Sequence, residues 1–171
     1  ILFNPDKWGV HGYTKHYQKY FSKFKNKPMT LLEIGVGGYN DPEKGGASLK
    51  MWKVFFKKAK IVAIDIEDKT ALCDKRTFVY KGNQTDENLL LKLARVHGPF
   101  EIIIDDGSHV NSDVIFTFNY LFPSVKEGGY YIIEDTQTSY FAEKYGGGME
   151  GNTIMNYFKQ LTDSLNYREF P

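Results

Sequence analysis

The sequence lacks the features that would tie it to a membrane, to an oxidising compartment or to nucleic acid. Cys73 is the only cysteine among its 171 residues, which excludes an internal disulfide and favours a reducing compartment, so a cytoplasmic location is expected. No apolar run reaches the ~20 residues of a membrane-spanning helix. The formal net charge is +1 and no basic cluster is present, so neither nucleic acid nor a membrane is expected as a partner.

The length is that of one domain with a sizeable core. We expect a single domain over residues 1–171, with residues 1–28 as a helical cap and residues 29–171 as an α/β core. The cap segment places aromatic residues at helical spacing, so it either packs on the sheet or covers a cofactor site. A homo-oligomer is compatible with this composition.

Short apolar runs alternate with amphipathic segments of helical length along the chain. Strands are predicted at residues 29–36, 60–66, 77–80, 100–105 and 130–134. Helices are predicted at residues 11–24, 47–58, 85–97, 110–125 and 152–165. This alternation predicts a doubly wound, Rossmann-like parallel α/β sheet with right-handed crossovers.

Acidic residues stand at the ends of the fourth and fifth predicted strands. The fourth strand runs into Asp105-Asp106-Gly-Ser-His109, and the fifth ends in Glu134-Asp135. Ligands bind at the carboxyl edge of open α/β sheets, so Asp106, Glu134, Asp135 and His109 are expected to meet there. Carboxylates suit the hard cation Mg²⁺, and a neutral imidazole can accept the proton of a hydroxyl at cellular pH.

Structural roles compete with this interpretation. Asp105, Asp106 or Ser108 could cap the helix that follows the fourth strand. His109 could be hydrogen-bonded to backbone at the start of that helix. The three remaining histidines lack a partnered acidic motif and are expected to be structural: His11, His16 and His97.

A glycine-rich turn follows the first predicted strand. Glu33 precedes Gly35 and Gly37, and glycines at this place let the backbone approach a ligand closely. The pattern is not the dinucleotide fingerprint, because Asn40 stands where the third glycine would fall, and it lacks the lysine of a P-loop.

Polar residues at the ends of the next two strands favour a nucleoside ligand. Asp65 ends the second strand, where a carboxylate can accept hydrogen bonds from two ribose hydroxyls. Asn83 and Gln84 follow the third strand, where their amides could pair with an adenine edge. The competing interpretations are a strand-end turn for Asp65 and a helix-entry turn for the two amides.

Seven segments in matching order resemble the macrolide sugar O-methyltransferases, a family that includes the demethylmacrocin and mycinamicin enzymes. They are Asp6-Lys-Trp-Gly9, His11-Gly-Tyr-Thr14, Leu32-Glu-Ile-Gly-Val-Gly-Gly-Tyr39, Ile64-Asp-Ile66, Gly82-Asn-Gln-Thr-Asp86, Ile104-Asp-Asp-Gly-Ser-His109 and Ile133-Glu-Asp135. The resemblance implies a class I methyltransferase fold with S-adenosylmethionine as donor and a required Mg²⁺.

By residue match, the resemblance also implies functional roles. It implies Asp106, Glu134 and Asp135 as metal ligands and His109 as general base. The expected cofactor site comprises Glu33, Gly35, Gly37, Asp65, Asn83, Gln84 and Asp105. A complete fold of this class ends in an antiparallel strand hairpin, which is not visible in this sequence, so either the chain is truncated near Pro171 or the set of predicted strands is incomplete.

The expected function is Mg²⁺-dependent transfer of a methyl group to a hydroxyl of a sugar or glycosylated small molecule. One alternative is a methyltransferase that acts on a non-sugar diol or an amine. Another is a methyltransferase-like domain that binds a ligand or partner without catalysis. A dinucleotide oxidoreductase fits less well, because the glycine pattern misses a position.

Overall fold

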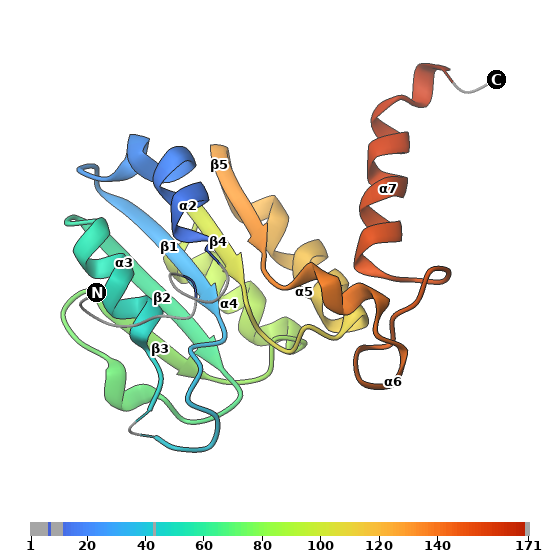
Figure 1. The fold of residues 1–171 in the computed structure, drawn as a ribbon. Helices are drawn as coiled ribbons and strands as arrows, with labels where there is room; N and C mark the ends of the chain where they lie inside the picture. Colours follow the sequence, from blue (N-terminus) through green and yellow to red (C-terminus); the bar gives the residue numbers. More distant parts are fainter. Residues whose placement is uncertain (1–6, 8–11, 43, 170–171) are drawn as a thin grey trace.

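The computed structural model describes residues 7, 12–42 and 44–169, and Figure 1 shows one twisted sheet with helices on both of its faces. Its five parallel strands lie in the order β3-β2-β1-β4-β5. They are β1 (Met29–Ile34), β2 (Ala59–Asp65), β3 (Thr77–Lys81), β4 (Phe100–Asp105) and β5 (Val125–Ile133). The predicted doubly wound α/β sheet is therefore confirmed.

The central strands are apolar on both faces because helices cover both faces of the sheet. In β1, Leu31 packs into one hydrophobic cluster and Leu32 into the other, and both side chains are fully buried. Leu31 pairs with Ile61 of β2 and with Ile102 of β4, so three apolar strands form the middle of the core.

The helices divide between the two faces of the sheet. The helices α2 (Thr14–Phe21) and α3 (Ala47–Phe55) contribute to the first cluster, and α4 (Glu87–His97) and α5 (Asn111–Leu121) to the second. The last long helix, α7 (Ile154–Leu165), lies beside α5 (Figure 1), where the Phe158 ring packs 5.0 Å from Phe118. Short helices complete the chain: η1 (Ser22–Phe24), η2 (Thr70–Leu72), η3 (Phe122–Ser124), η4 (Thr136–Tyr140), α6 (Ala142–Tyr145) and η5 (Tyr167–Glu169).

Several element boundaries differ from the sequence prediction, and two of these differences have a clear structural cause. Strand β5 begins at Val125, five residues earlier than predicted, because it continues through a bulge opposite β4. Val125 pairs with Phe100, the register then shifts, and Tyr130 pairs with Ile102. Helix α4 begins at Glu87, because the carboxylate of Asp86 caps it by accepting a hydrogen bond from the Leu89 amide.

Within residues 7, 12–42 and 44–169, no helix has both the length and the apolar character needed to cross a membrane.

Candidate functional site

The carboxyl ends of β1, β4 and β5 lie side by side and form the floor of the candidate site. The Asp106 amide donates a hydrogen bond to the Ile34 carbonyl over 2.9 Å, just beyond β1. The Glu134 amide donates to the Asp105 carbonyl over 3.0 Å, which extends the pairing of β4 with β5. Main-chain contacts therefore fix where Asp106 and Glu134 leave the sheet, as expected for strand ends of a parallel sheet.

Two carboxylates and one imidazole gather at this edge. His109 Nε2 lies 3.8 Å from Asp106 Oδ1 and 4.0 Å from Asp135 Oδ2. One ligand atom from each of the three residues lies within 4.8 Å of the other two, and all three side chains are partly exposed. The cluster can therefore be reached from solvent and carries two negative charges beside one titratable base.

The backbone at this cluster is unusual. His109 and Asp135 have φ angles of 57° and 51°, in the left-handed region that residues other than glycine rarely adopt. The Thr138 hydroxyl lies 3.2 Å from the carbonyl oxygen of His109 and 2.8 Å from that of Asp135. Such conformations cost free energy and concentrate at functional sites. Thr138 thus braces the two residues whose side chains face each other.

Lys7 is a buried cation beside these carboxylates. Its ammonium lies 2.5 Å from Asp106 Oδ2, 2.7 Å from Glu134 Oε2 and 3.7 Å from Glu33 Oε1, and its side chain is 1% exposed. Burial alone would lower the pKa of Lys7, but the charges of the three acids outweigh it and raise that pKa, so the ammonium stays protonated. Sequence reasoning missed this contact, and the only signal was the presence of Lys7 in the first shared segment.

Glu33 and Glu134 differ from Asp106 and Asp135 because their carboxylates are buried. Glu33 accepts hydrogen bonds from Ser48 Oγ and Trp52 Nε1 of α3, and burial raises its pKa to about 8. Glu134 accepts from the Tyr17 hydroxyl as well as from Lys7, and burial raises its pKa to about 7. The ammonium of Lys7 therefore offsets much of the cost of burying these two carboxylates.

The donor set suits a hard divalent cation. Two oxygen ligands that are each about 2.1 Å from one Mg²⁺ lie at most about 4.2 Å apart, so the cluster would need only a small rotation of its carboxylates. Of the predicted ligands, the structure brings Asp106 and Asp135 to this point beside His109. The carboxylate of Glu134 is held by Lys7 and Tyr17, and one oxygen of Asp106 is shared with the same ammonium.

The predicted cofactor residues line the neighbouring strand ends. Gly35 and Gly37 lie in the loop after β1 with φ angles of 82° and 70°. The Asp65 carboxylate folds back on that loop: Oδ2 accepts from the Val36 amide and Oδ1 from the Glu67 amide, each over 2.9 Å. Each oxygen keeps a second lone pair that a ribose hydroxyl could use.

The two amides beyond β3 are held differently. Asn83 Oδ1 accepts from the amide and the hydroxyl of Thr85, as in a helix-entry turn. Gln84 is buried: its Oε1 accepts from the Ser108 amide over 2.7 Å, and its Nε2 lies 3.4 Å from Asp105 Oδ1. Burial raises the pKa of Asp105 to about 7. Gln84 therefore ties the loop after β3 to the loop after β4.

In the part of the chain that the structure covers, neither Asp105 nor Asp106 caps helix α5, which follows β4. Val110 precedes α5 and makes no side-chain cap, while Ser108 Oγ accepts from the Val110 amide and donates to Asp113. Among the other histidines, His97 pairs with the Tyr80 hydroxyl over 2.8 Å, a structural contact. His11 lies outside the described residues.

A Gly35→Ala substitution should destabilise the protein much more than Gly37→Ala. A Cβ at Gly35 would lie 2.2 Å from the Asp106 carbonyl oxygen, whereas a Cβ at Gly37 meets nothing within 4 Å. Left-handed strain costs about 1 kcal/mol at either site, and the backbone clash at Gly35 adds about 2 kcal/mol more. Urea unfolding of the two variants measures the difference, and equal midpoints would contradict this account of the loop.

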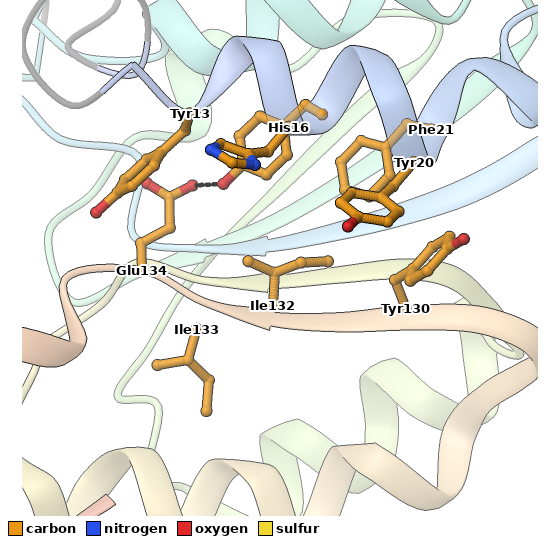
Figure 2. Close-up of a pocket in the computed structure, with 9 residues that line it drawn as sticks. Tyr13, His16, Tyr20, Phe21, Tyr130, Ile132, Ile133 and Glu134 are labelled. Carbon is orange, nitrogen blue, oxygen red and sulfur yellow. Dashed lines mark hydrogen bonds between the residues drawn. The ribbon is translucent and has the colours of Figure 1, made fainter. Parts of the chain in front are cut away.

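An apolar pocket of about 230 Å³ lies between α2 and β5, next to the acids. Figure 2 shows Tyr13, His16 and Glu134 at one end and Tyr20, Phe21 and Tyr130 at the other, with Ile132 pointing toward the helix. The pocket and the carboxylate cluster meet at Glu134. Helix α2 therefore borders the candidate site. The sequence alone left open whether this segment packs on the sheet or covers a cofactor site.

Comparison with known proteins gives consistent matches over the whole chain. No protein-family model matches. The chain is 45% identical over 170 residues to demethylmacrocin O-methyltransferase from Streptomyces fradiae, covering 96% of this chain and 43% of that protein. It is 41% identical over 172 residues to 8-demethyl-8-alpha-L-rhamnosyl tetracenomycin-C 2'-O-methyltransferase from Streptomyces olivaceus, covering 100% of this chain and 46% of that protein.

A solved structure gives the same result. The MycE methyltransferase of the mycinamycin biosynthetic pathway, in complex with Mg and SAH, superposes with a TM-score of 0.93 at 41% identity, covering 99% of this chain and 44% of that chain. The present chain thus spans about half the length of the curated relatives that it matches.

Proposed function

We propose that this chain, as a homologue of the macrolide and sugar O-methyltransferases with the class I methyltransferase fold, is a methyltransferase. It moves a methyl group from S-adenosylmethionine to a sugar hydroxyl in a Mg²⁺-dependent reaction. The observation that carries the proposal is the cluster of Asp106, His109 and Asp135 at the carboxyl edge of the sheet. The proposed acceptor is a glycosylated small molecule, because one relative is named for a rhamnosyl-bearing acceptor.

The acids of the cluster and His109 have different proposed roles, metal binding for the acids and proton transfer for His109. Asp106 and Asp135 would hold the Mg²⁺ ion, and Glu134 would be the third ligand once its carboxylate turns from Lys7 and Tyr17 toward the ion. The bound ion would orient the acceptor and lower the pKa of its hydroxyl. His109 takes the hydroxyl proton at Nε2, which lies 3.8 Å from Asp106 Oδ1 and 4.0 Å from Asp135 Oδ2. Mg²⁺ prefers oxygen ligands, which leaves His109 for the role of base.

The cofactor takes the strand ends beside the metal. S-adenosylmethionine would supply a methyl group that its sulfonium already activates. Gly35 and Gly37 admit it close to the backbone, and Asp65 accepts hydrogen bonds from its ribose. The proposed site is completed by Glu33, Asn83, Gln84 and Asp105. Residues 1–171 act as one domain, with residues 1–28 as a cap over the α/β core of residues 29–171. A cytoplasmic location suits the free thiol of Cys73.

Calorimetry tests this proposal directly. S-adenosylmethionine is titrated into the protein with Mg²⁺ and with EDTA, and Mg²⁺ is then titrated alone. We expect saturable binding of both, followed by formation of S-adenosylhomocysteine when demethylmacrocin or the rhamnosyl tetracenomycin is added. Cofactor binding without metal binding would remove the metal mechanism, and turnover of a non-sugar diol alone would replace the acceptor class. Absence of cofactor binding would contradict the proposal as a whole.

A further inference from the structure

Glu134 and Asp135 are consecutive residues, yet their carboxylates take different directions at the end of β5. The left-handed backbone of Asp135, with φ of 51°, turns the chain between them. Asp135 Oδ2 lies 4.0 Å from His109, while the Glu134 carboxylate reaches Lys7. Some part of the molecule must hold each side chain in its direction, because a carboxylate on a strand-end turn has several rotamers.

Tyr13, the residue that precedes α2, and Tyr17 within α2 each contact one of the two acids. The Tyr13 hydroxyl donates to Asp135 Oδ1 over 2.7 Å, and the Tyr17 hydroxyl donates to Glu134 Oε1. Residues four apart lie on the same face of a helix, so one face of α2 delivers both phenols. The Asp135 amide also donates to the Tyr13 oxygen over 3.3 Å, so Tyr13 contacts both the side chain and the main chain of Asp135.

We propose that Tyr13 and Tyr17 are positioning residues that fix the directions of Asp135 and Glu134, so that the start of α2 sets the geometry of the metal site. This inference rests on the proposed function. Tyr13 engages one oxygen of Asp135, and its other oxygen then faces His109. Hydrogen bonds to ionised acceptors are strong and directional, and partners of this kind orient metal ligands.

Packing of α2 does not depend on the Tyr13 hydroxyl. Phe21 is buried, and its ring lies 5.8 Å from Tyr130 and 6.2 Å from Trp52. The Tyr17 ring stacks on Phe21 at 5.0 Å, so the helix is anchored by its aromatic rings. Removal of the Tyr13 hydroxyl should therefore leave the helix in place while freeing Asp135 to rotate. This separation makes the proposal testable.

Tyr13→Phe should weaken Mg²⁺ binding by about 10- to 100-fold, the usual effect of losing a partner that orients a metal ligand. The affinity is measured by calorimetric titration of Mg²⁺. Tyr20→Phe is the matched control, because Tyr20 lies on α2 but is 46% exposed and stacks against Tyr130. The control should bind Mg²⁺ as the wild type does. Thermal unfolding in EDTA should be the same for all three proteins.

Three outcomes would overturn the inference. Tyr13→Phe could bind Mg²⁺ as tightly as Tyr20→Phe, which would remove the positioning role alone. It could also lose thermal stability and S-adenosylmethionine affinity in EDTA together with metal affinity, which would indicate a general structural role. A wild-type protein that binds no Mg²⁺ would instead remove the metal site itself, a failure of the proposed function that the first titration reveals.

Discussion

The Asp106→Asn variant is expected to lose Mg²⁺ affinity by at least about 100-fold, more than the loss of an outer-shell partner causes. Asp106 is placed at the sheet edge by its main-chain bond to Ile34 and supplies one oxygen to the cluster with His109. Asparagine has the same shape but no negative charge. Mg²⁺ titration measures the loss, and turnover should disappear with it.

The fold should survive this substitution, so the loss can be assigned to the metal site. Lys7 stays paired through Glu134 at 2.7 Å, which avoids an uncompensated buried charge. S-adenosylmethionine binding in EDTA should be retained. Asp113→Asn is the matched control, because that acid lies on α5 and contacts the hydroxyls of Ser108 and Ser112. Undiminished Mg²⁺ binding and turnover in Asp106→Asn would place the metal elsewhere.

The His109→Ala variant should lower turnover by about 10²- to 10⁴-fold, the range typical of a lost general base. Affinities for S-adenosylmethionine and Mg²⁺ should change little, because the proposed role of His109 is proton transfer. Turnover is measured as S-adenosylhomocysteine formed at saturating cofactor and metal. Added imidazole should restore part of the activity by occupying the space that the side chain leaves.

The same variant distinguishes a base from a ligand. His109 Nε2 lies close enough to Asp106 and Asp135 to share a cation with them. A drop in Mg²⁺ affinity comparable to that of Asp106→Asn would make His109 a ligand and end its assignment as base. His97→Gln is the control, because His97 pairs with Tyr80 on β3, away from the cluster. Its turnover should match that of the wild type.

The buried ammonium of Lys7 reduces the repulsion among the acids of the site. Acids alone would repel one another at this edge, but a buried ammonium joins Asp106 and Glu134 and approaches Glu33. The negative charges of the proposed metal ligands are therefore partly compensated by Lys7. Lys7 contributes this charge, and Tyr13 and Tyr17 contribute the phenols, so the segment that packs on the sheet through α2 also borders the carboxylate cluster.

Most of the fold could be predicted from the sequence, because it depends on local patterns. Short apolar runs such as Phe100–Asp105 are too brief for helices, and strand β4 has these bounds in the structure. The alternation of strands with helices leaves few topologies, and the parallel order around β1 is one of them. The sequence pattern places the start of β5 five residues late, because the strand passes through a bulge before its apolar run begins.

The sequence by itself determined which acids stand at strand ends, because the carboxyl ends of parallel strands share one edge of the sheet. Only the tertiary structure decided how their side chains are used. Lys7 and Tyr17 contact Glu134 across 127 and 117 residues of chain, and Tyr13 contacts Asp135 across 122. Contacts of that range leave no periodic trace in the sequence, since a side chain's partner depends on the packing of whole elements. That packing alone places oxygens of Asp106 and Asp135 near His109 and the carboxylate of Glu134 against Lys7.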